Sequence, residues 1–139
     1  MPDETWVIIL THGSAGEELL KSAEMIMGKL KNAASFSLLP GMSPETFSSM
    51  VEQKLRTLSG HVLVLADLFG GTPFNVAVAL SQKYDLYIVS GLNIAMLMEA
   101  DILRKKITGK KLADAVKQVG IDACRIPKFL KKEGDENHG

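Results

Sequence analysis

The sequence predicts an α/β protein of three layers, in which an open and mainly parallel sheet carries helices on both faces. Short apolar runs without alternation, such as "WVIILT" and "VLVLA", are typical of strands buried on both sides. The segments between them carry apolar residues at helical spacing. Strands that alternate with helices favour a parallel sheet covered on both faces. A chain of 139 residues is long enough to bury the core of one such domain.

The composition is that of an ordinary globular protein and excludes several functional classes. Hydrophobic residues make up 46% and charged residues 23%, and 16 basic residues balance 16 acidic ones. We therefore expect no nucleic-acid partner and no anionic membrane target. Cys124 is the single cysteine, so neither a disulfide within the chain nor a cysteine-rich metal site is expected. The acidic start "MPDETWVIIL" is not a signal peptide, and a cytoplasmic protein is expected.

Apolar runs define the strands of the predicted sheet. These strands are residues 6–11, 35–39, 62–66 and 86–89. We also consider a short antiparallel C-terminal strand at residues 123–126, just before Pro127. The domain is expected to cover residues 1–126, and residues 127–139 are expected to form a flexible tail of mixed charge.

Helices are predicted between and after these strands. A capping box and two pairs with proline at the first turn mark three helix starts: Ser14 with Glu17, Ser43 with Pro44, and Thr72 with Pro73. The first of these helices is expected at residues 15–28. A methionine-rich helix is expected from Asn93 to about residue 105, and a last helix is expected to stop at Gly120.

Polar residues follow the predicted strands at the edge where ligands bind in open α/β sheets. His12, Asp67 and Gly91 each come after a strand, so all three are expected at the carboxyl edge. If the first and third strands are neighbours, His12 and Asp67 face each other. A carboxylate that accepts the proton of Nδ1 leaves Nε2 with a free lone pair, which makes an oriented nucleophile.

The loop "LFGGTPFN" predicts an anion site beside that histidine. Gly70 and Gly71 permit tight or positive-φ backbone and close approach by another group. Thr72 and Pro73 have the chemistry of a helix start, where unpaired N–H groups and the helix dipole attract an anion. A nucleophilic nitrogen beside an anion site indicates phosphoryl transfer through a phosphohistidine.

Other chemistries fit these residues less well. "HGSAG" departs from the G-x-S-x-G elbow because His12 occupies the first glycine position, although Ser14, His12 and Asp67 keep a hydrolase open. Asp67 also suits a phosphorylated aspartate, but no acidic pair follows the first strand to hold magnesium. "TGKKLA" is not a P-loop, and His12 with Asp67 alone would under-ligate a metal.

Three motifs in order resemble the enzyme IIA domain of the mannose family of the sugar phosphotransferase system. They are "VIILTHGSAGEELLKSAEMIMG", "LADLFGGTPFNVA" and "IVSGLNIAMLMEA", and the resemblance runs to about Gly120. It implies an open α/β sheet, a homodimer and a phosphorylated histidine. His12 would carry the phosphoryl group, Asp67 would hold its other nitrogen, and Thr72 would contact the phosphate. The other residues of the predicted phosphate site are Gly13, Ser14, Gly70 and Gly71.

The resemblance also implies the partners of this chain. The histidine-containing phosphocarrier protein would donate the phosphoryl group and a IIB component would accept it, with membrane IIC and IID components involved indirectly. No IIB segment follows in these residues, so we expect the acceptor on a separate chain. Neither a metal nor a cofactor is expected, because both transfers exchange phosphoryl groups of similar energy.

Two alternatives share parts of this interpretation. The phosphotransferase subunit of dihydroxyacetone kinase has the same fold and histidine, although the three motifs fit the sugar-transport branch better. A non-catalytic regulatory module would bind phosphorylated partners without taking up the phosphoryl group.

Relatives often carry a small polar residue after the aspartate, where this chain has Leu68. The sugar cannot be read from these motifs.

Overall fold

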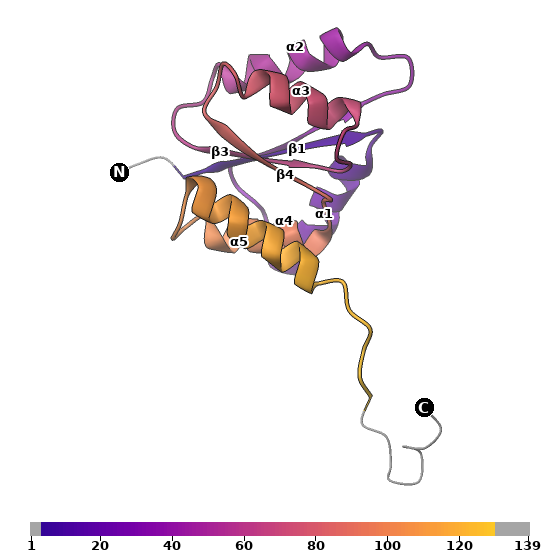
Figure 1. Cartoon of the computed structure of the whole chain (residues 1–139), viewed down its shortest axis with the longest axis vertical. Coiled ribbons are helices and arrows are strands. Elements are labelled where there is room, and N and C mark those ends of the chain that lie inside the picture. The colour runs from indigo at the N-terminus through magenta and orange to yellow at the C-terminus, as the bar shows by residue number, and fades with distance from the viewer. Residues whose placement is uncertain (1–3, 130–139) are drawn as a thin grey trace.

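A computed structural model describes residues 4–129 and contains a parallel sheet between two layers of helices (Figure 1). The strands lie in the order β2-β1-β3-β4, and all neighbouring pairs are parallel. The predicted α/β class is thereby confirmed. In chain order the elements are β1 (Trp6–His12), α1 (Ala15–Met27), β2 (Ala33–Leu38), α2 (Pro44–Leu55), β3 (Val62–Ala66), α3 (Thr72–Leu80), β4 (Leu86–Ser90), α4 (Ile94–Leu103) and α5 (Gly109–Asp122).

Alternation along the central strands divides the core between the two faces of the sheet. Val7 and Ile9 of β1 face the layer made by α1, α4 and α5. Ile8 and Leu10 face the layer made by α2 and α3, which lies on the other side in Figure 1. These four side chains are at most 1% exposed. Each fully buried aliphatic side chain contributes about 1.5–3 kcal/mol, so the central strands are anchored from both faces.

The start of α1 differs from the predicted capping box. The Ser14 side chain makes no capping hydrogen bond, because its backbone (φ −89°, ψ 12°) is not in the extended conformation of a side-chain cap. The hydroxyl of Thr11 instead accepts the N–H of Gly16 at 2.9 Å. Gly16 lies against β1, where an added Cβ would come within 2.7 Å of Ile9 Cγ2. The helix therefore packs close enough for a strand residue to cap it.

The other predicted helix starts fare differently. Ser43 caps α2, since its hydroxyl accepts the N–H of Thr46 at 3.1 Å. Asn93 caps α4 through the N–H of Met96 at 2.9 Å. Thr72 is not a cap: Gly71 holds that position in extended backbone, and Thr72 is the first residue of α3. The first two predictions are confirmed and the third is wrong by one residue.

The last helix does not stop at Gly120 but continues to Asp122. A Cβ at Gly120 would lie 2.5 Å from Met96 Cγ, and the Gly120 carbonyl accepts a hydrogen bond from Asn93 Nδ2 at 3.2 Å. This glycine therefore allows α5 to pack closely on α4, where Asn93 binds its carbonyl, and the helix continues past it.

The predicted strand at residues 123–126 is wrong. These residues follow α5 without strand pairing in the described part of the chain, and residues 123–129 are exposed as they extend from the body in Figure 1. Because no strand covers it there, β4 is an edge of the sheet over residues 4–129. Most of the predicted tail, residues 130–139, lies outside the described residues. None of the helices described is both long and apolar enough to cross a membrane.

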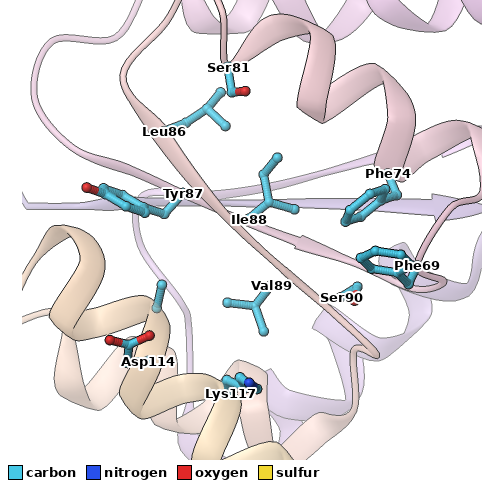
Figure 2. A pocket seen from close by; sticks show the side chains of 11 residues that line it. Phe69, Phe74, Ser81, Leu86, Tyr87, Ile88, Val89, Ser90, Asp114 and Lys117 are labelled. Carbon is cyan, nitrogen blue, oxygen red and sulfur yellow. The ribbon is translucent and has the colours of Figure 1, made fainter.

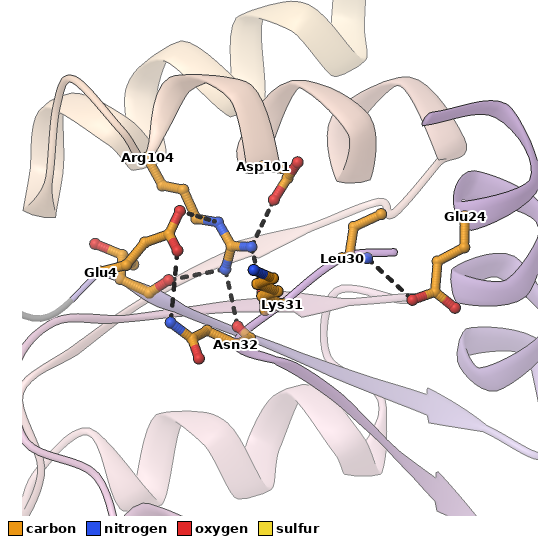
Figure 3. A network of polar contacts seen from close by, with 8 residues as sticks. Glu4, Glu24, Leu30, Lys31, Asn32, Asp101 and Arg104 are labelled. Carbon is orange, nitrogen blue, oxygen red and sulfur yellow. Dashed lines mark hydrogen bonds and ion pairs between the residues drawn. The ribbon is translucent and has the colours of Figure 1, made fainter. Parts of the chain in front are cut away.

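A buried arginine closes the amino edge of the sheet (Figure 3). The side chain of Arg104, just after α4, is 1% exposed and forms ion pairs with Asp101 at 2.5 Å and Glu4 at 3.3 Å. Its guanidinium also donates to the carbonyls of Thr5, Lys31 and Asn32. These contacts join the end of α4 to the starts of β1 and β2, so they stabilise the fold at the edge opposite the candidate site.

Candidate functional site

The candidate site lies where the order of the strands reverses. His12 is the last residue of β1, and Asp67 directly follows β3, which pairs with β1 through Leu10 and Ala66. The chain passes from β1 to β2 on one side, whereas β3 and β4 lie on the other side. Such a switch point leaves a crevice outside the carboxyl ends of the strands, and ligands of open α/β sheets bind there.

Asp67 orients the imidazole of His12 through two contacts. Oδ2 of Asp67 lies 2.9 Å from Nδ1 of the ring and accepts the backbone N–H of His12, also at 2.9 Å. A carboxylate at Nδ1 favours the tautomer with the proton on that nitrogen. Nε2 then keeps its lone pair. The neighbouring strands therefore bring together the two residues that the sequence analysis paired across 55 positions.

The pair is open to solvent on the side of the histidine. The side chain of His12 is 47% exposed and that of Asp67 is 26% exposed. The second carboxylate oxygen, Oδ1, is buried and has no hydrogen-bond partner among the described residues. An unsatisfied buried acceptor costs about 1–3 kcal/mol. This cost offsets part of what the two hydrogen bonds to Oδ2 contribute to stability.

The Nε2 edge of the ring lies against the start of α3. A Cβ at Gly71 would come within 2.8 Å of Cε1 and 3.4 Å of Nε2 of His12, so a side chain there would displace the imidazole. Pro73 has no N–H, and the N–H groups of Thr72 and Phe74 belong to the first turn, where helices lack internal acceptors. An anion attached to Nε2 would meet these donors and the positive end of the dipole.

The loop before α3 is held in place by local contacts. Gly70 has φ +83°, a conformation that favours glycine, and its carbonyl accepts a hydrogen bond from Asn75 Nδ2 at 3.1 Å. The N–H of Gly71 donates to the Leu68 carbonyl at 3.1 Å. The ring of Phe69 packs on Phe74 with centroids 4.6 Å apart. Gly71 thus provides room for the histidine because it lacks a Cβ, and its N–H is already bound to Leu68.

Thr72 and Leu68 offer different groups to the site. The Thr72 side chain is partly buried at the first residue of α3, and its hydroxyl has no hydrogen-bond partner in residues 4–129. That hydroxyl is available to an anion at the helix start. Leu68 is 59% exposed and has no polar side-chain atom.

Gly13 and Ser14 directly follow His12 in the bend between β1 and α1. Gly13 has φ +57°, its N–H donates to the Leu38 carbonyl at 2.7 Å, and its carbonyl accepts from Thr11 Oγ1 at 3.2 Å. Ser14 is exposed, and its carbonyl accepts the N–H of Glu18. No hydrogen bond joins the Ser14 hydroxyl to His12 in the described chain, so the contact that a serine nucleophile requires is not formed.

Sequence reasoning missed Thr11, Leu38 and Asn75, which position the loops of the site. Leu38 acts through its backbone carbonyl, and Asn75 contacts the backbone of the loop just before its helix, so neither has a signature in the sequence. Thr11 did carry a signal, because it is a polar residue at the end of an otherwise apolar buried run.

A groove of about 540 Å³ runs along the free edge of β4 (Figure 2). Figure 2 shows Phe69 and Phe74 on one side and Asp114 and Lys117 of α5 on the other, with Val89 of β4 between them. The methionine-rich helix α4 offers little apolar surface for association with a second copy, because Met96 is 2% exposed and Leu97 is fully buried in the protein's own core.

Fold and site together define an open parallel α/β protein with a carboxylate-oriented histidine at its switch point, beside the start of a helix. The model of the family described as PTS system fructose IIA component matches residues 6–117. The chain belongs to this family of the sugar phosphotransferase system (PTS), as the motifs in the sequence predicted. IIA components of this mannose and fructose type serve sugar transport and are phosphotransferases in general.

Individual relatives agree with the family. The chain is 39% identical over 101 residues to the PTS system mannose-specific EIIAB component of Escherichia coli K12, with 70% of this chain and 31% of that protein covered. The chain thus spans about a third of the length of this relative. It is 33% identical to the PTS system fructose-specific EIIA component of Bacillus subtilis, over 86% of this chain and 84% of that protein.

A solved structure matches the whole architecture. The mannose/sorbose-specific IIA subunit of the phosphotransferase system from Enterococcus faecalis superimposes with a TM-score of 0.86 at 32% identity. The match covers 94% of this chain and 99% of that one. The arrangement of strands and helices around His12 is therefore that of a IIA component.

Proposed function

We propose that the chain is a cytoplasmic phosphoryl carrier whose nucleophile is Nε2 of His12. It accepts the group from the phosphohistidine of the histidine-containing phosphocarrier protein and passes it to a IIB component during sugar uptake, upstream of the membrane IIC and IID components. The observation that carries this proposal is the 2.9 Å contact between Nδ1 and Asp67, which leaves Nε2 as the free nitrogen beside the start of α3.

The transfer balances without any further reactant. The Nε2 lone pair forms a bond to phosphorus while the bond between phosphorus and the donor nitrogen breaks, and the electron pair of that bond stays on the donor imidazole. The proton on Nδ1 stays in its hydrogen bond to Asp67, whose charge stabilises the positive ring of the phosphorylated state. Transfer to IIB repeats this exchange in reverse. The donors of the first turn of α3 and the Thr72 hydroxyl bind the phosphoryl oxygens.

Incubation with the labelled phosphorylated donor tests this function. We expect wild type to take up acid-labile, base-stable label and His12→Ala to take up none while staying folded. His61→Ala is the matched control, because His61 is exposed and contributes its backbone carbonyl to the Trp6 N–H. Label on His12→Ala would overturn the assignment. No label on wild type would favour a regulatory module, and transfer only toward dihydroxyacetone kinase would favour that alternative.

A homodimer remains part of the proposal. The edge of β4 and the groove beside it, lined by Phe69, Phe74 and Tyr87, support association with a second copy. Sedimentation equilibrium at micromolar concentration should give twice the mass of the chain. A monomer under these conditions would remove the dimer from the proposal and leave the phosphoryl transfer untouched.

A further inference from the structure

We propose that Thr11 is a positioning residue for His12, an inference that rests on the proposed phosphoryl transfer. Thr11 is the penultimate residue of β1, and it is fully buried. Its hydroxyl donates to the Gly13 carbonyl at 3.2 Å and accepts the Gly16 N–H at 2.9 Å. One hydroxyl thus joins both sides of the bend that carries the chain from β1 through His12 into α1.

The alternation of β1 gives Thr11 and His12 separate tasks. Thr11 points to the same face as Val7 and Ile9, toward α1, whereas His12 points to the opposite face, toward α3. A Cβ on Gly16 would lie 2.9 Å from Thr11 Cγ2, so the methyl group packs directly against the helix start. The hydroxyl is therefore screened from solvent and from the phosphoryl group, and Thr11 acts on the chemistry only through the backbone.

The backbone around His12 is fixed by three contacts, and Thr11 supplies one of them. Asp67 accepts the N–H of His12 at 2.9 Å. Leu38 accepts the N–H of Gly13 at 2.7 Å. Thr11 holds the Gly13 carbonyl and ties this peptide to α1. Because the ring fits between Asp67 and Gly71, a small shift of the His12 Cα would move Nε2 from the helix start.

Loss of the Thr11 hydroxyl would leave two backbone groups without their partner. Ser14, which stands at the usual capping position, makes no side-chain cap and sits in a backbone conformation unsuited to it. We therefore infer that removal of the hydroxyl lets the bend relax and slows transfer from bound donor, while the docking of the donor protein is unchanged. Misplacement of reacting groups by about 1 Å lowers rates on the order of a hundredfold.

The test compares three variants. Thr11→Val keeps the shape and removes the hydroxyl, and Thr11→Ser keeps the hydroxyl. Thr5→Val is the matched control, because Thr5 is 1% exposed near the other end of β1 and its hydroxyl has no hydrogen-bond partner in the described chain. Transfer from phosphorylated donor gives kcat and KM, denaturant melts give the folded fraction, and ¹⁵N NMR of the imidazole gives the tautomer of His12.

We expect Thr11→Val to lower kcat roughly tenfold to hundredfold with little change in KM, and to lower the population of the Nδ1–H tautomer. Thr11→Ser should recover most of kcat, and Thr5→Val should match wild type. A wild-type kcat in Thr11→Val, or an equal loss in Thr5→Val at equal folded fraction, would overturn the inference.

Two further outcomes keep the inference separate from the proposed function. If wild type takes up no label, the proposed function fails. The ¹⁵N measurement alone then decides the role of Thr11, and an unchanged His12 tautomer in Thr11→Val contradicts the inference. If Thr11→Val does not fold, Thr11→Cys replaces it, since a thiol is a weak acceptor. The same loss of kcat is then expected, and a wild-type kcat contradicts the inference.

Discussion

The two ends of β1 each hold a polar cluster, and the clusters differ in solvent exposure and in the number of partners of the central side chain. At the amino end, Arg104 is 1% exposed, and its guanidinium meets two carboxylates and three backbone carbonyls. At the carboxyl end, His12 is 47% exposed, and only its Nδ1 side is paired. The first cluster is closed to solvent, although Arg104 Nε makes no hydrogen bond there, and the second is open to solvent on the Nε2 side of the ring.

The difference separates a structural role from a chemical one. A buried charge is tolerated only when partners surround it, so the cluster around Arg104 stabilises one arrangement of α4, β1 and β2. At the other end, the Thr72 hydroxyl and Asp67 Oδ1 have no partner among the described residues. The Thr72 hydroxyl can donate to an incoming phosphoryl group at this switch point, whereas the anionic carboxylate can act only on the imidazole.

The largest effect is expected at the closed end. Arg104→Met should lower the free energy of unfolding by about 3–5 kcal/mol, because it leaves two carboxylates and three carbonyls without their donor. Urea melts measure this change, and the rate of transfer per folded molecule should stay at the wild-type value. A loss of stability under about 1 kcal/mol would contradict a structural role for the Arg104 end, and so would a reduced transfer rate per folded molecule.

The next effect is expected at the carboxylate of the open end. Asp67→Asn should slow transfer on the order of a hundredfold, by analogy with residues that orient metal-binding histidines. Its stability should change little, since the carboxylate already has one buried oxygen without a partner. The transfer rate and the urea midpoint are measured together. Wild-type transfer by this variant would show that the 2.9 Å contact does not act on the chemistry.

The smallest effect distinguishes two residues of the loop. Thr72→Ala should slow transfer about tenfold or more, because a charge-assisted hydrogen bond to phosphate contributes roughly 1.5–3 kcal/mol. Leu68→Ala should change the rate only slightly, since its exposed side chain has no donor. Rates are compared at equal folded fraction. If Leu68→Ala proves as damaging as Thr72→Ala, the division of roles in this loop is wrong.

The fold was predictable from the sequence where one physical signal dominated. The runs "WVIIL" and "VLVLA" are buried on both faces, so composition alone reveals them as central strands, and parallel order then brings His12 and Asp67 together. The family motifs pointed to the same two residues.

The details that failed depend on packing between distant segments. Thr11 caps α1 in place of Ser14 because α1 lies close on β1. Gly120 lies within a helix and not at its end, and the reason for a glycine there is Met96, which occupies the space that a Cβ would need. Met96 and Leu97 of the methionine-rich helix are likewise buried in the core. Such contacts are set by the assembled layers and leave no local pattern in the sequence.

The central claim is that Nε2 of His12 carries the phosphoryl group, and ³¹P–¹⁵N correlation NMR of the phosphorylated protein tests it most directly. Nδ1 faces Asp67 at 2.9 Å, so the account predicts one phosphorus nucleus coupled to Nε2 of His12 and none to His61. Coupling to Nδ1 of His12, or to any other residue, would contradict it.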